Sequence, residues 1–103
     1  EERIVDIMNF IRSHYSVVTL DMLSENFNLT KPYLSKYIKV KAGTTFQDEV
    51  KRIRMKHACN MLKETNQTVE SIAAYVGYEN VEHFNRLFKK EFHMTPLQYR
   101  NEK

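Results

Sequence analysis

An all-α fold is predicted by three features of this sequence of 103 residues. First, glycine and proline occur only twice each, which favours helices with short connections over a turn-rich β fold. Second, apolar residues recur at helical spacing in successive segments that begin with helix-capping residue types. Third, one helix pair occurs twice along the chain. These features predict about seven helices in two similar subdomains, which a long central linker helix joins.

The first subdomain, residues 1–43, is predicted to contain three helices. Residues 2–14 form an amphipathic helix, Thr19 is the N-cap of a short second helix, and Thr30 is the N-cap of a third. Gly43 can end the third helix by taking a left-handed conformation. The apolar side chains expected to pack these helices together are Ile4, Ile7, Met8, Ile11, Leu20, Leu23, Phe27, Leu34, Tyr37 and Ile38.

The linker helix, within residues 44–64, and the second subdomain, residues 65–103, continue the helical pattern. Thr68 and Asn80 are the expected N-caps of two helices that a turn separates. Thr95–Gln98 is a capping box with proline at the first helical position, which predicts a short final helix. The apolar residues expected to face inward are Phe46, Val50, Ile53, Ala58, Met61, Leu62, Val69, Ile72, Ala73, Phe84, Leu87 and Phe88.

The two subdomains share an internal repeat. Thr19–Asp21 matches Thr68–Glu70 at an offset of 49 residues, and Leu34–Lys36 matches Phe84–Arg86 at an offset of 50, because one extra residue enters the second copy near its turn. Each copy is therefore predicted to be a short helix, a tight turn and a second helix, which is the helix-turn-helix pattern. One copy could arise by chance, whereas two copies with matched core and basic positions are a much stronger signal.

The charge of the chain is unevenly distributed. Residues 1–29 carry two basic and five acidic groups, whereas residues 30–103 carry fourteen basic and eight acidic groups, a net charge of +6. A positive surface over this second stretch suggests a polyanionic partner. A solvated surface with a modest lysine excess is the alternative interpretation, and charge alone leaves both open.

The linker helix has a length that suits duplex DNA. Roughly 18–20 residues with a rise of about 1.5 Å each give a helix about 30 Å long. The two recognition helices of a dimeric repressor lie about 34 Å apart, which is one turn of DNA. A rigid linker of this length could therefore let one chain place two recognition helices in successive major grooves.

Residues of the linker helix and of the second repeat together form a known pattern. They are Arg54, Ala58 and Met61–Leu62 in the linker helix, and Ile72–Ala73, Val76–Tyr78, Phe84–Lys90, Thr95–Pro96 and Tyr99–Arg100 in the second repeat. On these residues the chain resembles the AraC/XylS family of transcription regulators, over about residues 4–100. The second repeat carries most of the resemblance. One departure is His93, where the family usually has glycine and where the first repeat keeps Gly43; a positive φ there would give His93 a modest strain cost.

The resemblance implies a homeodomain-like DNA-binding domain in which the second helix of each repeat is the recognition helix. The N-terminal and solvent-facing side chains of such a helix contact the base edges. The base-contact positions of the family fall on Pro32, Ser35, Lys36, Val81, Glu82, Asn85 and Arg86. Phosphate contacts are expected from Lys31, Lys39, Asn80, His83, Lys89 and Lys90.

The chemistry of these side chains predicts unequal roles for the two recognition helices. Arg86 can donate two hydrogen bonds to guanine and Asn85 can pair with adenine, whereas Pro32 offers only a small apolar contact. An ion pair with Glu82, one turn earlier, is the alternative role of Arg86. Glu82 itself could accept from cytosine or interact with the helix dipole, and both interpretations stay open. We therefore expect residues 80–90 to carry most of the sequence specificity.

Other charged and aromatic residues are expected to have structural roles. Arg54 is interpreted as a structural ion-pair partner rather than a DNA contact. A solvated face of the linker helix is expected to carry Lys51, Arg52 and Lys56. The aromatic residues expected in the core, rather than as platforms for base stacking, are Phe84, Phe88, Phe92 and Tyr99.

The sequence argues against an enzyme. The histidines share no metal-ligand spacing with one another or with the single cysteine, and no glycine-rich phosphate loop occurs. We therefore expect no catalytic residue, no metal and no cofactor. A module that presents a basic face to an acidic partner protein is the second hypothesis, and a steep fall of DNA affinity with salt would separate the two. The histidines and the cysteine that lack metal-ligand spacing are His14, His57, His83, His93 and Cys59.

The resemblance also implies partners and a location. Double-stranded DNA is the expected partner, activation is favoured over repression, and RNA polymerase is an added partner of an activator. The family usually has a separate effector-binding or dimerisation domain, so this chain is expected to be a monomeric fragment of a longer regulator. No apolar run is long enough to span a membrane, and no signal-peptide pattern opens the chain. The expected location is the bacterial cytoplasm, at the nucleoid.

Overall fold

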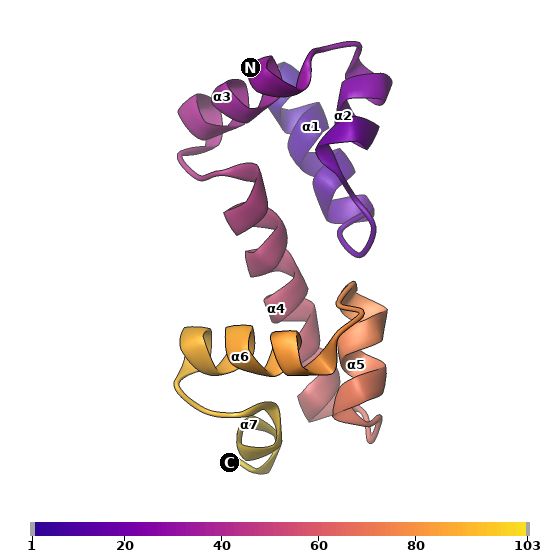
Figure 1. The fold of residues 1–103 in the computed structure, drawn as a ribbon, viewed down its shortest axis with the longest axis vertical. Helices are drawn as coiled ribbons and strands as arrows, with labels where there is room; N and C mark the ends of the chain where they lie inside the picture. Colours follow the sequence, from indigo (N-terminus) through magenta and orange to yellow (C-terminus); the bar gives the residue numbers. More distant parts are fainter. Residues whose placement is uncertain (1, 103) are drawn as a thin grey trace. The chain divides into compact units, whose positions relative to one another are not determined.

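Seven α-helices make up the computed structural model over residues 2–102, the part of the chain that it describes (Figure 1). No strand occurs among these residues, so the predicted all-α fold is confirmed. Glu1 and Lys103, the end residues of the predicted subdomains, lie outside the described residues. The helices are α1 (Glu2–Ser13), α2 (Leu20–Phe27), α3 (Lys31–Ala42), α4 (Phe46–Glu64), α5 (Val69–Val76), α6 (Val81–Phe92) and α7 (Pro96–Asn101).

The chain forms two compact units, and the border between them lies inside α4. The N-terminal unit ends at Ile53, and the C-terminal unit begins at Arg54. Each unit contains a short helix followed by a longer one, α2 and α3 in the first and α5 and α6 in the second (Figure 1). These pairs are the two copies of the predicted repeat. The central helix contributes its first half to one core and its second half to the other.

The core of the N-terminal unit fixes α3 through one side only. Ile7 and Ile11 lie one helical turn apart on α1 and are fully buried, as is Leu23 of α2. Leu34 and Ile38 face them from α3 and are also fully buried. Because these two residues lie one turn apart, they define the inner side of α3 and leave its opposite side in solvent.

Aromatic rings build much of the core of the C-terminal unit. Phe84 and Phe88 of α6 are fully buried, and their ring centroids lie 5.8 Å apart. The Phe88 ring also contacts Phe92 at 4.6 Å and Tyr99 of α7 at 5.6 Å between centroids. Phe84 and Phe88 therefore have the predicted core role, while Phe92 and Tyr99 are half-buried at its edge. These ring contacts hold α6 and α7 together.

Five helices begin at the N-caps that the sequence predicts. In each, the side-chain oxygen of the cap accepts a hydrogen bond from the backbone N–H three residues later, which satisfies one of the unpaired donors of the first turn. The predicted capping box at the start of α7 is also present, because the Gln98 side chain accepts from the backbone of Thr95 at 2.8 Å. The five caps are Thr19, Thr30, Thr68, Asn80 and Thr95.

Four helices end at a residue in the left-handed conformation. Gly43 (φ 78°) and Gly77 (φ 117°) adopt it freely, and Gly43 has its predicted role. Asn28 (φ 56°) is the residue that tolerates it best after glycine. His93 (φ 62°) ends α6 at the position that matches Gly43. The backbone of this histidine, which stands where the family usually has glycine, therefore has the positive φ that was considered from the sequence.

We expect His93→Gly to raise the free energy of unfolding by about 0.5–1 kcal/mol. Glycine removes the clash of Cβ with the left-handed backbone, and the greater entropy of glycine in the unfolded chain offsets part of the gain. Urea unfolding followed by circular dichroism measures the change.

The matched variant is Gly43→Ala, for which we expect a loss of about 1 kcal/mol. A Cβ at Gly43 would meet no atom within 4 Å, so backbone strain alone sets the cost. Equal effects of the two variants, or a destabilised His93→Gly, would contradict this account of the left-handed caps.

Two arginines anchor the second half of α4 within the C-terminal unit. Arg100 of α7 donates to the Leu62 carbonyl at 2.9 Å and to the Thr65 carbonyl at 3.2 Å, so it caps the C-terminal end of α4. Arg54 donates to the Gly77 carbonyl at 3.3 Å, and its guanidinium lies 5.1 Å from the centre of the Tyr78 ring. Arg54 therefore has a structural role, in which a carbonyl and an aromatic face are its partners.

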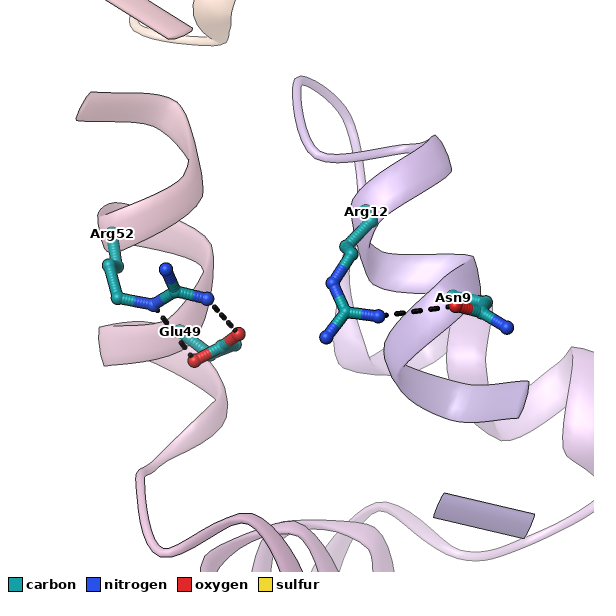
Figure 2. A network of polar contacts seen from close by, with 4 residues as sticks. All are labelled: Asn9, Arg12, Glu49 and Arg52. Atoms are coloured by element: carbon teal, nitrogen blue, oxygen red, sulfur yellow. Dashed lines mark hydrogen bonds and ion pairs between the residues drawn. The ribbon is translucent and has the colours of Figure 1, made fainter. Parts of the chain in front are cut away.

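A buried carboxylate lies in the first half of α4, within the N-terminal unit. Glu49 is 5% exposed, and Arg52 donates to its two oxygens at 2.7 and 3.4 Å. This hydrogen bond raises the pKa of the Arg52 guanidinium above its usual value. Figure 2 shows the pair on α4 together with Arg12, which donates to Asn9 on α1. Arg52 is itself exposed, as expected for the solvated face of the linker helix, and it also holds this buried acid.

Candidate nucleic-acid interface

The exposed side of α3 presents the residues that were predicted to face DNA. Pro32, Ser35, Lys36 and Lys39 are all exposed, and Leu34 lies on the buried side between them. Spacings of three and four residues bring these side chains onto one surface of the helix. Among the described residues no ion pair engages Lys36 or Lys39, so both ammonium groups are available to an anion.

The predicted base-contacting residues of α6 differ in their exposure to solvent. Glu82 and Arg86 are exposed, whereas Val81 and Asn85 are half-buried. Within residues 2–102 Arg86 forms no ion pair with Glu82, which was the alternative role considered for it. The guanidinium of Arg86 is therefore free to donate to a ligand, and its two-bond contact with guanine stays a prediction.

Asn85 lines a cavity of about 600 Å³ within the C-terminal unit. Its Oδ1 atom is buried and has no hydrogen-bond partner among the described residues. The predicted contact with adenine therefore requires this buried oxygen to become exposed, where it would gain a donor. The other residues that line the cavity are Asn66, Thr68, Val69, Glu70, Val81, Thr95, Pro96, Leu97 and Arg100.

The predicted phosphate contacts are exposed, but some already have a partner in the protein. Lys31 forms an ion pair with Asp21 of α2 at 3.0 Å. Asn80 uses its side-chain oxygen as the N-cap of α6, which leaves its amide nitrogen as a donor. The His83 ring packs edge-on against Tyr78 at 5.9 Å between centroids. Lys89 and Lys90 lie in the last turn of α6, where their charge also favours the helix dipole.

The described residues hold no other site with obvious chemistry. No three His, Cys, Asp or Glu side chains lie close enough together in residues 2–102 to hold a metal ion. Cys59 is half-buried, and this burial raises the pKa of its thiol. None of the described helices has the length and apolar composition of a membrane span.

A family model described as a helix-turn-helix domain matches residues 23–102. Among curated proteins, an HTH-type transcriptional regulator of Bacillus subtilis, YobQ, is 31% identical over 93 residues, which is 89% of this chain and 39% of that protein. The HTH-type transcriptional activator RhaS of Escherichia coli is 28% identical over 95 residues, 91% of this chain and 34% of RhaS. The chain thus spans well under half the length of these relatives.

Solved structures share this fold. The C-terminal domain of AraT, a response regulator from Geobacillus stearothermophilus, matches with a TM-score of 0.91 and 32% identity over 97% of this chain and 84% of that one. The C-terminal domain of the response regulator yesN from Fusobacterium nucleatum matches with a TM-score of 0.84 and 39% identity, covering 97% of this chain and 96% of that one. The DNA-binding domain of AdpA, solved with a target DNA, shares the fold at 13% identity, with a TM-score of 0.86 over 94% of this chain and 88% of that domain.

Proposed function

Because this chain belongs to the AraC/XylS family of transcriptional regulators, whose helix-turn-helix domains bind double-stranded DNA, we propose that α3 and α6 bind two successive major grooves of one operator. The observation that carries the proposal is the repetition of one surface. Each unit buries the apolar side of its longer helix and exposes a polar or basic side near the N-terminal end. The continuous helix α4, with 19 residues at about 1.5 Å each, has a length of about 28 Å, close to one turn of DNA.

The two helices have different side chains and therefore different roles in the proposal. On α3 the exposed residues include a proline, a serine and lysines, which suit contact with the backbone more than with base edges. On α6, Arg86 and Asn85 offer hydrogen-bonding groups that distinguish guanine and adenine. In this proposal the two helices contribute unequally: α3 mainly contacts the DNA backbone, and α6 mainly recognises the base sequence.

Lys39→Ala tests the backbone-holding role of α3. Removal of one phosphate contact lowers the slope of log affinity against log salt by about one, and it weakens binding to operator and random DNA by the same factor. Fluorescence anisotropy with a labelled duplex at several salt concentrations measures both quantities. The matched control is Lys56→Ala, because Lys56 is an exposed lysine of α4 outside the proposed surface. A steeper loss on operator than on random DNA would contradict the assignment of Lys39 to a phosphate.

The same titration decides between DNA and an acidic protein as the partner of the basic face. Binding of duplex DNA that falls steeply with salt supports the proposal. An absence of DNA binding at low salt would reject it and favour the protein-interaction hypothesis.

Activation of transcription, rather than repression, is the regulatory outcome that we favour. RhaS, which is similar to this chain over 95 residues, is named a transcriptional activator. RNA polymerase is then a second partner. In vitro transcription from a promoter that carries the bound site tests this part: a rise in transcript supports it, and a fall shows repression.

A further inference from the structure

An exposed aromatic ring lies beside the proposed contact surface of α3. Tyr33 is the third residue of α3 and is 48% exposed. It directly follows Pro32 and lies one helical turn before Lys36, so it sits at the edge of the exposed side. A tyrosine in this position offers a flat apolar ring and a hydroxyl that can donate a hydrogen bond.

The Tyr33 ring is held in place by a second tyrosine. Tyr33 and Tyr37 are stacked, with 5.7 Å between ring centroids and 17° between ring planes. Tyr37 is half-buried, so its stack with Tyr33 restricts the position of the exposed ring on α3. A side chain that is already fixed loses little conformational entropy when a ligand binds, in contrast to a mobile lysine.

The internal repeat supplies an independent observation. At the offset of 50 residues Tyr33 matches His83, which is also the third residue of its helix, is exposed, and rests its ring on a tyrosine, Tyr78, at 5.9 Å. Both units therefore place a polar-tipped aromatic ring, supported by another ring, at the same position of the recognition helix. In the N-terminal unit Lys31 forms an ion pair with Asp21. A second hydrogen-bond donor near the start of α3 would therefore help this helix to contact a phosphate.

We propose that the Tyr33 hydroxyl donates a hydrogen bond to a DNA phosphate at the edge of the groove that α3 occupies. The proposal rests on the proposed function of the chain as a two-helix DNA reader. Tyrosine is among the side chains that bind phosphate oxygens, and such contacts fix the register of the protein without reading sequence. Tyr33 is thus a positioning residue that does for α3 what His83 is predicted to do for α6.

Tyr33→Phe removes the hydroxyl and keeps the ring, so the stack with Tyr37 and the fold are retained. We expect affinity to fall about 3- to 10-fold on operator and random DNA alike, since the net contribution of one typical hydrogen bond is lost. The slope of log affinity against log salt stays unchanged, because no charge is removed. The matched control is Tyr75→Phe, which removes the hydroxyl of a tyrosine of α5 that is 63% exposed, and it should bind as the unaltered chain does.

Replacing single phosphates of the bound duplex by neutral methylphosphonates identifies the contact directly. For the unaltered chain we expect one phosphate in the half of the site bound by α3 whose replacement costs about 3- to 10-fold, and for Tyr33→Phe no further loss at that phosphate. Unchanged affinity of Tyr33→Phe, or losses that add at every phosphate, would overturn the assignment. If the unaltered chain binds DNA with normal salt dependence in that case, only the role of Tyr33 is rejected; if it does not bind, the proposed function fails as well.

Discussion

Replacing Phe88 by alanine lowers the free energy of unfolding by about 3–5 kcal/mol. Phe88 is fully buried, and its ring contacts Phe84, Phe92 and Tyr99, so the deletion removes the centre of the aromatic core and leaves a cavity. A loss of this size is a large share of the stability of a small domain. Chemical unfolding followed by circular dichroism measures it.

The control for Phe88→Ala is Tyr75→Ala, which truncates an exposed aromatic side chain of the same unit and should change stability by no more than about 0.5 kcal/mol. Because Phe88 fixes α6 against α7, the variant should also lose specific DNA binding once the C-terminal unit unfolds. A cost for Phe88→Ala below about 1.5 kcal/mol would show that the aromatic core does not hold α6.

Arg86→Ala should reduce the affinity for the operator by about 5- to 150-fold, which corresponds to about 1–3 kcal/mol for a two-bond contact with guanine. Arg86 is exposed on α6 and has no ion-pair partner in the described chain, so little stability is lost with it. Binding to random DNA should weaken only by the loss of one charge. Anisotropy titrations with operator and random duplexes give both values.

Lys90→Ala is the matched control for Arg86→Ala, because it removes one exposed positive charge from the last turn of the same helix. It should weaken binding to both duplexes by a similar factor. If Arg86→Ala also acts equally on operator and random DNA, Arg86 contacts phosphate and the reading role of α6 loses its main residue.

The helices and their caps could be predicted from the sequence because the interactions that define them are local. Each N-cap accepts from a backbone N–H three residues away, and the apolar periodicity extends over one or two turns. The same holds for Gly43, whose left-handed conformation follows from its place after a helical segment. The exposure of Ser35, Lys36 and Arg86 follows equally from their spacing relative to buried neighbours.

Other features depend on contacts between distant parts of the chain, and periodicity carries no information on them. Arg100 caps α4 through carbonyls that lie 35 and 38 residues earlier. Glu49 lies in the first turn of α4 among charged residues, where solvent exposure is the natural expectation, yet it is buried. The burial of the Asn85 oxygen without a partner among the described residues likewise leaves no trace in the periodicity. Of these, only Arg100 had a signal in the sequence, its place in the Tyr99–Arg100 pair that resembles the family.

Selection of bound sequences from a pool of random duplex DNA tests the two-helix reading most directly. The account predicts two enriched blocks whose centres lie about 10 to 10.5 base pairs apart, with stronger base preference in one block than in the other. Repeating the selection with Arg86→Ala should relax the stronger block and leave the weaker one and the spacing unchanged. A single enriched block, or two blocks of variable spacing, would contradict the claim that α3 and α6 occupy successive major grooves.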